Sequence, residues 1–236
     1  MAQLKLTLSA NAGGVLELGE HRLWIDALHN QKVLGFSTLD GNLQGKMLQN
    51  PNFQNPELIA FTHCHPDHFS QELTQKAMEL WPETEVFLPE SHFSSQVLLT
   101  GHEYTWERED LQLRFLALTH EGVQYANTHH YGLLIAWQGM HILIPGDCQV
   151  ADSALSGMLQ SVEIDLAILN FPWLTLKKGR GYLEQVMKPK QAIFWHLPFG
   201  ADDTNSFRPS AEAALKQYRG NGVLLADPLR TLELHI

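Results

Sequence analysis

The 236-residue sequence has little cysteine, a deficit of basic residues and no long apolar run. Its two cysteines, Cys64 and Cys148, are too few for a disulfide framework, so a reducing cytoplasm is the expected location. No stretch approaches the ~18 consecutive apolar residues of a membrane span. The N-terminus alternates like a strand and does not resemble a signal peptide. We therefore expect a cytoplasmic protein with no membrane partner.

The charge balance is acidic, with 16 lysines and arginines against 26 aspartates and glutamates and a formal net charge of -10. Such a surface disfavours non-specific binding to a polyanion, so no nucleic-acid partner is expected. Hydrophobic residues make up 44% of the sequence and are spread along it without a linker or low-complexity segment. A chain of this length can bury a sizeable core. We therefore expect one domain over residues 1–236.

The apolar pattern predicts short strands that alternate with turns and helices. The first three strands should form an antiparallel meander, and the strands on either side of Gln138-Gly139-Met140 should form a hairpin. The predicted strands are 4–8, 15–18, 23–25, 58–61, 85–88, 104–109, 111–118, 131–137, 141–144, 166–170, 192–195, 223–226 and 229–234. Helices are predicted after an N-cap at Ser70 to about Leu80, and over 90–99, 181–187 and 209–218, with a long loop over 35–55. The pattern favours an α/β fold with two packed sheets and outer helices.

Histidine is abundant, with 13 residues, and four candidate metal ligands follow the strand 58–61 within six residues. These are His63, His65, Asp67 and His68. Two histidines that are two residues apart in an extended segment can bind one metal ion, while Asp67 and His68 can reach a second ion as the chain turns into a helix. Imidazole and carboxylate suit zinc, and also iron or manganese. Single histidines are common on surfaces, but this density after a buried strand favours a metal site.

This run resembles the HxHxDH signature of the metallo-β-lactamase superfamily, including the preceding Thr62. Asp26, Gly146-Asp147 and His196 resemble further motifs of that superfamily and occur in the same order. The resemblance spans almost the whole chain. It implies an αββα four-layer sandwich of two mixed β-sheets flanked by helices. In that family the residue at the Asp26 position supports the site without binding metal.

The resemblance also implies two divalent metal ions, foremost Zn²⁺, with Mn²⁺ or iron as alternatives. The implied ligands of the first ion are His63, His65 and His120, those of the second are Asp67, His68 and His196, and Asp147 bridges the two. His120 ends a predicted strand, about where the family places its third histidine. His129 and His130, at the start of the predicted hairpin, remain alternatives to it.

Two neighbouring cations lower the pKa of bound water toward ~7 and polarise a substrate oxygen. The compact length and the His196 ending resemble the cytoplasmic lactonase-like branch of the superfamily. The resemblance therefore implies a dinuclear hydrolase that would use a metal-bound hydroxide to cleave a small ester-type substrate, such as a lactone. Asp67 is the candidate catalytic residue, which would orient the hydroxide and protonate the leaving group. The alternatives are a metal-dependent phosphodiesterase acting on small nucleotides and a non-catalytic metal-stabilised binding protein.

Several other residues are weaker candidates. Phe171 and Trp173 follow a predicted strand and can line a substrate pocket, although such aromatic residues more often belong to a core or its rim. Cys148 is interpreted as a small buried residue, and Cys64 should point away from its neighbouring ligands. The remaining histidines without a motif are interpreted as structural or surface residues: His21, His29, His92, His102, His141 and His235. The sequence leaves the oligomeric state open.

Overall fold

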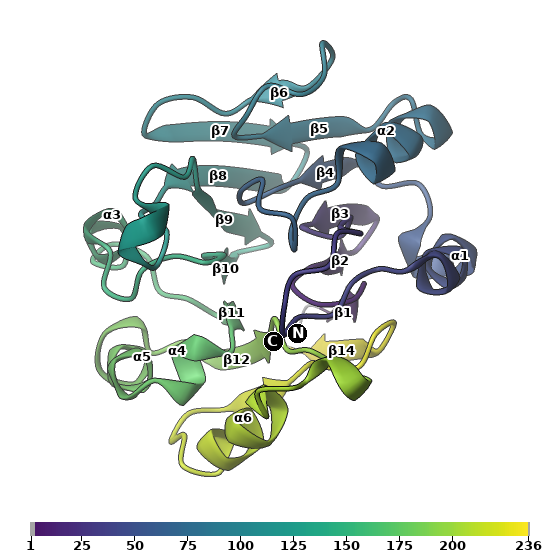
Figure 1. Cartoon of the computed structure of the whole chain (residues 1–236). Coiled ribbons are helices and arrows are strands. Elements are labelled where there is room, and N and C mark those ends of the chain that lie inside the picture. Colours follow the sequence, from purple (N-terminus) through teal and green to yellow (C-terminus); the bar gives the residue numbers. More distant parts are fainter. Residues whose placement is uncertain (1–2, 236) are drawn as a thin grey trace. The chain divides into compact units, whose positions relative to one another are not determined.

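The computed structural model describes residues 3–235, and they divide into two compact units, each built around one seven-stranded sheet (Figure 1). Unit 1 consists of the described parts of Met1–Leu98, His196–Arg208 and Leu225–Ile236. Unit 2 consists of Leu99–Trp195 and Pro209–Leu224. The expectation of one domain over residues 1–236 stays a prediction.

The sheet of unit 1 is mixed. Its strands are, in spatial order, β14 (Thr231–His235), β1 (Gln3–Leu8), β2 (Gly14–Leu18), β3 (His21–Ile25), β4 (Leu58–Ala60), β5 (Glu85–Leu88) and β6 (Val97–Leu98). Strands β14 to β3 are antiparallel neighbours, which confirms the predicted meander, and β3 to β6 run parallel. The parallel part brings the carboxyl ends of β3 and β4 to the same edge.

Helices α1 (Gly41–Gln49) and α2 (Gln71–Leu80) pack on this sheet and close the core of unit 1. The Ser70 hydroxyl accepts the N–H of Leu73 at 3.3 Å, so the predicted N-cap and helix are confirmed. Trp24 is fully buried, with its ring edge-on to Phe53 and Trp81 at centroid distances of 5.6 and 5.2 Å. Such aromatic pairs add to the stabilisation from burial.

Two local predictions in unit 1 were wrong. Residues 35–55 do not form one long loop, because Asp40 caps α1 through a 2.8 Å bond from the Leu43 N–H and the short turn η1 (Pro51–Phe53) follows. Residues 90–99 do not form a helix. There the Gln96 side chain accepts the N–H groups of His92 and Phe93, both at 2.7 Å, and holds the segment as a loop before β6.

The sheet of unit 2 is also mixed. Its strands are, in spatial order, β13 (Gly222–Leu224), β12 (Gln191–Trp195), β11 (Leu166–Asn170), β10 (Met140–Ile144), β9 (Tyr131–Trp137), β8 (Leu111–Ala117) and β7 (Glu103–Arg108). The predicted hairpin is confirmed: Gln138 and Gly139 take φ values of 48° and 78° between β9 and β10. Both positive values suit the tight turn that matches strand twist.

The remaining helical segments are short. They are η2 (Val123–Tyr125), α3 (Ser153–Met158), α4 (Pro172–Thr175), α5 (Lys177–Tyr182), the π-helical η3 (Leu183–Met187), η4 (Gly200–Asp202) and α6 (Phe207–Leu215). The helix expected over 181–187 therefore begins earlier, at Lys177, and Pro209 lies in the first turn of α6 as predicted. Two mixed sheets flanked by helices confirm the predicted α/β class.

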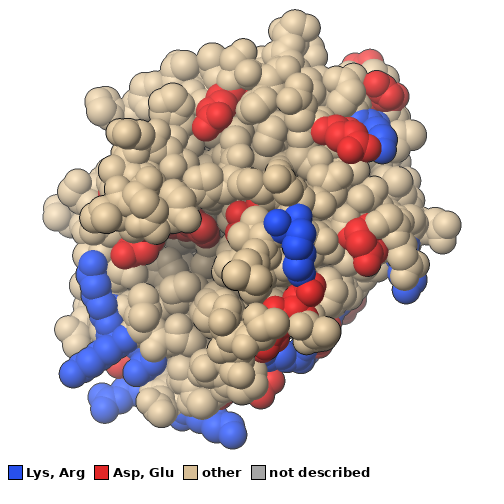
Figure 2. All heavy atoms as spheres, viewed as in Figure 1, with Lys and Arg blue, Asp and Glu red and all other residues tan. Residues whose placement is uncertain are grey.

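The surface is mostly uncharged on the face drawn in Figure 2, where basic and acidic residues are both scattered. Among residues 3–235, no helix combines the length and the apolar character that crossing a bilayer requires.

Candidate metal centre

The histidine run, His63 to His68, follows β4. Its start is held by hydrogen bonds to Asp26, which directly follows the neighbouring strand β3. The buried Asp26 carboxylate accepts the Thr62 backbone N–H at 2.8 Å and the Thr62 hydroxyl at 2.7 Å. Asp26 adopts a φ of 49°, which is unfavourable for a non-glycine residue and persists where surrounding structure enforces it. The parallel pairing of β3 and β4 thus positions the start of the histidine run.

Two histidines of the run each form a hydrogen bond to another side chain through one ring nitrogen. The Nδ1 atom of His63 lies 3.0 Å from the Thr62 hydroxyl oxygen, and Nδ1 of His68 lies 3.1 Å from Oδ2 of Asp26. Both side chains are fully buried. A hydrogen bond at Nδ1 fixes the tautomer and orientation of an imidazole and leaves Nε2 as the ligand atom.

Asp67, His68 and His196 form a compact group in unit 1. The Nε2 atoms of His68 and His196 are 3.0 Å apart, and Oδ2 of Asp67 lies 3.5 Å from Nε2 of His196. All three ligand atoms lie within 4.8 Å of one another. Zinc–nitrogen bonds of about 2.0–2.1 Å in tetrahedral geometry place two ligand atoms about 3.3 Å apart. The group therefore fits one metal ion.

His196 is held in place by its backbone and by an aromatic neighbour. Its φ is 61°, and its N–H donates to the Asn11 carbonyl at 3.1 Å. The ring of Phe36 packs edge-on against its imidazole at 4.7 Å between centroids. These contacts fix the direction of the ring.

His63 and His65 extend the arrangement of imidazoles on the same loop. The centroid of His63 lies 4.5 Å from that of His65 and 4.1 Å from that of His68. His63 is buried and His65 is partly exposed. Three rings from six residues thus gather in unit 1, as the HxHxDH spacing predicts.

In unit 2, His120 and Asp147 lie together. Nε2 of His120 is 3.6 Å from Oδ2 of Asp147, while its Nδ1 atom donates to the Glu121 carbonyl at 2.8 Å. The Glu121 N–H in turn donates to the Asp147 carbonyl at 2.8 Å. His130 is buried with its ring 5.5 Å from that of His120, and His129 is exposed. The geometry within unit 2 favours His120 as the ligand.

Asn170 is a residue whose role the sequence did not indicate. Its Nδ2 atom donates to Oδ1 of Asp147, and its Oδ1 atom accepts the Trp195 indole N–H at 2.9 Å. Asn170 ends β11 and Trp195 ends the adjacent parallel strand β12. The indole therefore orients the amide, and the amide orients the carboxylate.

Asn11 and His29 were also missed, since neither belongs to a recognisable motif. Both side chains are fully buried in unit 1. Burial is the main cause that lowers the pKa of His29 to about 3. The nearby His68 and His196 lower this pKa further, whereas Asp67 raises it. His29 is therefore a neutral imidazole close to the Asp67–His68–His196 group.

The weaker candidates lie in interior positions. Trp173 is buried in α4 and packs edge-on against Tyr182 at 5.8 Å, and Phe171 is buried at the start of that helix. Their suggested role in a substrate pocket stays a prediction. Cys148 is buried, as expected, and donates to the Gln149 carbonyl at 3.2 Å. Burial raises the pKa of its thiol.

Another group of possible ligands combines a cysteine of the histidine run with two residues of the segment before β6. Cys64, Glu90 and His92 offer ligand atoms within 4.8 Å of one another, although the Glu90 side chain is 43% exposed. Burial raises the pKa of the Cys64 thiol, and the nearby Glu90 and Asp26 raise it further. Partly exposed groups of this kind are common without an ion, so proximity alone does not assign it a role.

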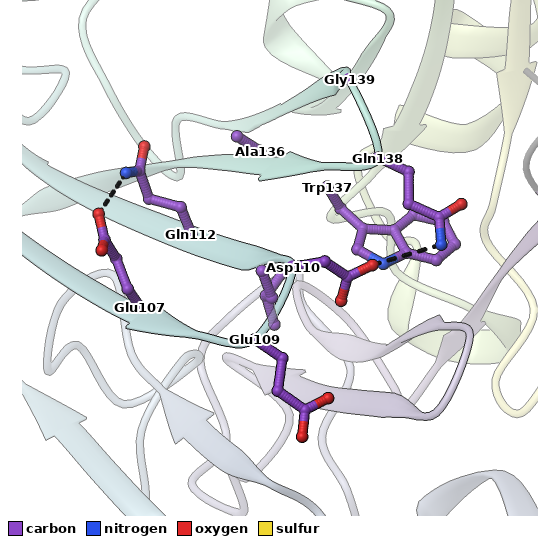
Figure 3. Close-up of a pocket in the computed structure, with 9 residues that line it drawn as sticks. Glu107, Glu109, Asp110, Gln112, Ala136, Trp137, Gln138 and Gly139 are labelled. Carbon is purple, nitrogen blue, oxygen red and sulfur yellow. Dashed lines mark hydrogen bonds between the residues drawn. The ribbon is translucent and has the colours of Figure 1, made fainter.

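Unit 2 also has a shallow, open pocket beside the β7–β8 and β9–β10 turns (Figure 3). The Gln112 amide donates to Glu107 at 2.5 Å and the Gln138 amide donates to Asp110 at 3.3 Å. These carboxylates are exposed and are already bound by amides, and the pocket contains none of the predicted site residues. It is a surface feature of the hairpin ends.

Comparison with known proteins decides the fold. No protein-family model and no curated protein matches the chain. The metallo-β-lactamase fold protein YhfI from Bacillus subtilis is 12% identical over 99% of this chain and 100% of its own, with a TM-score of 0.65. The chain has the metallo-β-lactamase fold. This confirms the fold that the sequence resemblance implied.

Two further proteins share the metallo-β-lactamase fold found here. Igni18, a metallo hydrolase from Ignicoccus hospitalis KIN4/I, is 16% identical over 99% of both chains, with a TM-score of 0.67. CmlA, a diiron β-hydroxylase from Streptomyces venezuelae, is 11% identical over 99% of this chain and 55% of its own, with a TM-score of 0.67. Similarity at these identities establishes the fold, while the chemistry has to be argued from the site.

Proposed function

We propose that this protein is a metal-dependent hydrolase that cleaves a small ester-type substrate, such as a lactone. The observation that carries the proposal is the 3.0 Å separation of Nε2 of His68 from Nε2 of His196, with Asp67 beside them. Two buried ring nitrogens at this distance are mutually unfavourable unless a proton or a cation lies between them. A metal ion stabilises such a pair and suits the nitrogen and carboxylate donors.

We further propose two ions per chain. The order of the motifs along the sequence supports this, and the proposed ligands are His63, His65 and His120 for the first ion, Asp67, His68 and His196 for the second, and Asp147 for both. Within unit 1 the Nδ1 atoms of His63 and His68 are hydrogen-bonded to the protein, which supports metal binding through their Nε2 atoms. Within unit 2 the Asn170 amide directs the Asp147 carboxylate, which supports its role as a ligand.

Such ions, when bound, lower the pKa of coordinated water and polarise the substrate's carbonyl oxygen. The chain's own residues move the proton and position the proposed ligands. The Asp67 carboxylate, with a side chain 13% exposed, is available to accept a proton from water and to return it to the leaving oxygen. Asp26 fixes the direction of the His68 ring through its hydrogen bond at Nδ1, and the buried surroundings of His63 and His68 exclude bulk water.

We propose zinc as the native metal because the donors are imidazoles and carboxylates. Iron and manganese bind the same donors, and CmlA, which shares the fold, is described as a diiron enzyme. We also propose a small-molecule substrate and a cytoplasmic location. Both cysteines are free, which is compatible with a reducing compartment.

The proposal is tested by activity screening of metal-stripped and metal-reconstituted protein. A panel of lactones and bis-p-nitrophenyl phosphate is assayed after chelation and after adding back zinc, manganese or iron. We expect lactone hydrolysis that chelation abolishes and one metal restores. Preferential cleavage of bis-p-nitrophenyl phosphate would support the phosphodiesterase alternative. No hydrolysis of any compound by fully metal-loaded protein would favour a binding protein.

A further inference from the structure

Two neighbouring segments of unit 1 leave the same edge of its sheet. Strands β4 and β5 are parallel and hydrogen-bonded side by side, so their carboxyl ends meet there (Figure 1). The histidine run follows β4, and residues 89–96 follow β5. A hydrogen bond from the Glu90 backbone reaches the Cys64 thiol, which places this cysteine of the histidine run against the second segment.

Three ligand groups of different chemistry converge between these segments. The Cys64 sulfur, a Glu90 carboxylate oxygen and a His92 ring nitrogen lie within 4.8 Å of one another. The ligand atoms of a tetrahedral zinc ion, bound at about 2.0–2.3 Å, are about 3.4–3.6 Å apart, so the three atoms need to approach by roughly 1 Å. The side chains of Glu90 and His92 are 43% and 23% exposed, which leaves them room for this movement.

The ring nitrogen of His92 is a buried atom that the fold does not use. This Nε2 atom has no hydrogen-bond partner within the described range 3–235. Oε2 of Glu90 lies 4.0 Å from it, which is too far for a hydrogen bond. Buried polar atoms are nearly always paired, and an ion is one of the explanations for an exception. A cation between the imidazole and the carboxylate would bind both groups.

The backbone that carries Glu90 and His92 is held in place by one side chain. The Gln96 amide donates to the Glu90 carbonyl at 2.7 Å and accepts the His92 N–H at 2.7 Å. The His92 ring also packs on the ring of Phe69, with 4.6 Å between the centroids. These contacts fix both residues beside Cys64, so that forming a metal site requires only side-chain movement.

We propose that Cys64, Glu90 and His92 bind a further divalent metal ion, zinc, with water completing its coordination. Thiolate, imidazole and carboxylate are the ligands that proteins offer to zinc, whereas magnesium and calcium take oxygen ligands. The ion itself deprotonates a coordinating thiol and offsets the repulsion between the thiolate and the carboxylate. Its effect is to tie the segment after β5 to the histidine run. The inference goes beyond the proposed hydrolysis and uses none of the ligands proposed for it.

Cobalt(II) tests the site because a thiolate ligand gives this ion a distinctive absorption. Charge transfer from sulfur to cobalt produces a near-ultraviolet band, which imidazole and carboxylate ligands do not give. The ligands proposed for the two hydrolytic ions include no cysteine, so the band reports the further site alone. Metal-free protein is titrated with cobalt chloride while absorption and bound cobalt are measured. We expect the wild type to develop the band with the intensity of a single cobalt–thiolate bond.

Variants of nearly the same size assign the band to the three side chains. Cys64→Ser should abolish it. Glu90→Gln and His92→Phe should each weaken cobalt binding at this site by more than the about 10- to 100-fold that follows loss of an outer partner. Two controls should keep the band: Cys148→Ala removes the other cysteine, and Glu83→Gln changes an exposed carboxylate of unit 1. Far-UV circular dichroism of the metal-free variants should match that of the wild type.

Three results would overturn this proposal. They are a wild type without the band, a band that Cys148→Ala removes, and a band that Glu90→Gln and His92→Phe leave unchanged. The last result would mean that Cys64 binds cobalt without the segment after β5. The two proposals can fail separately. The band in a protein that hydrolyses no compound would keep this site and reject the hydrolase, and metal-dependent hydrolysis without the band would reject only this site.

Discussion

Asp26 and His68 are joined by a 3.1 Å hydrogen bond between Oδ2 and Nδ1, and the opposite nitrogen of the same ring faces His196 at 3.0 Å. One carboxylate after β3 thus sets both the tautomer and the direction of a ligand from the loop after β4. The same carboxylate binds the backbone and hydroxyl of Thr62, whose oxygen contacts Nδ1 of His63. Asp26 therefore orients two histidines without being a ligand in the proposed site.

Replacing Asp26 should weaken metal binding. Asp26→Asn keeps the size of the side chain but removes the charge that holds His68, and we expect zinc affinity to fall by about 10- to 100-fold. Competition with a chromophoric chelator measures this. Asp40→Asn, which alters an exposed cap of α1, is the matched control and should bind zinc like the wild type. Unchanged affinity in Asp26→Asn would show that the hydrogen bonds are dispensable.

Gly13 should be intolerant of a side chain, whereas Gly45 should not. Gly13→Ala would drive a β-carbon into the Asp26 carbonyl, so we expect a loss of stability of roughly 1–3 kcal/mol and weaker zinc binding. Gly45 lies in α1 with open space around it, and Gly45→Ala should stabilise by about 0.5–1 kcal/mol. Urea denaturation of both variants compares them. Equal effects of the same sign would contradict the described packing.

Asn170 should act through Asp147. Asn170→Ala removes the amide that binds the carboxylate, and we expect metal affinity to fall by about 10- to 100-fold with little change in far-UV circular dichroism. Trp195→Phe removes the indole N–H that orients Asn170, together with part of a buried ring, and should cause a smaller loss of metal affinity than Asn170→Ala. A larger effect from Trp195→Phe, at equal stability, would reverse the proposed order of contacts.

Acid should weaken the support of the loop before His120. Burial alone would raise the pKa of the Asp152 carboxyl, but hydrogen bonds from Thr119, Leu155 and Ala154 outweigh it and leave the pKa below its ordinary value. The ionised carboxylate therefore contributes stability above the unfolded-state pKa of about 3.9, and this contribution is lost as pH falls through the lower folded-state value.

The variant Asp152→Ala tests this dependence. At pH 7 it should cost about 1–2 kcal/mol of unfolding free energy, because Asp152 caps α3 and binds the Thr119 N–H at 3.0 Å. The difference from the wild type should shrink between pH 4 and pH 2. Urea denaturation at several pH values measures it, and a constant difference would argue against a role for the charge.

The sequence indicates which candidate ligands lie together where these residues directly follow a strand. His63 to His68 come after a short apolar strand and before a capped helix, so their grouping follows from local structure. Helix α1 was missed because its glycine, asparagine and glutamine content resembles a loop and only Met47 is buried. The segment before β6 was misjudged because the Gln96 side chain competes with helical hydrogen bonding.

The surroundings of His29 and the contacts of Asn170 could not be predicted, because they depend on residues far away in sequence. His29 acquires its environment from Asp67, His68 and His196, and Asn170 from Asp147 and Trp195. Periodicity reports which face of an element is buried, but it does not report which polar groups meet there.

The central claim is that the chain binds catalytic metal ions through the histidine run, and elemental analysis combined with a hydrolysis assay tests it most directly. The wild type, His68→Asn and the exposed control His102→Asn are reconstituted with zinc and assayed on the lactone panel. Apart from the ion proposed at Cys64, we predict about two zinc ions per wild-type and control chain, about one for His68→Asn, and a loss of activity in His68→Asn that exceeds the 10- to 100-fold typical of an outer-sphere partner. Wild-type protein that binds no metal, or hydrolysis that neither chelation nor His68→Asn reduces, would contradict the account.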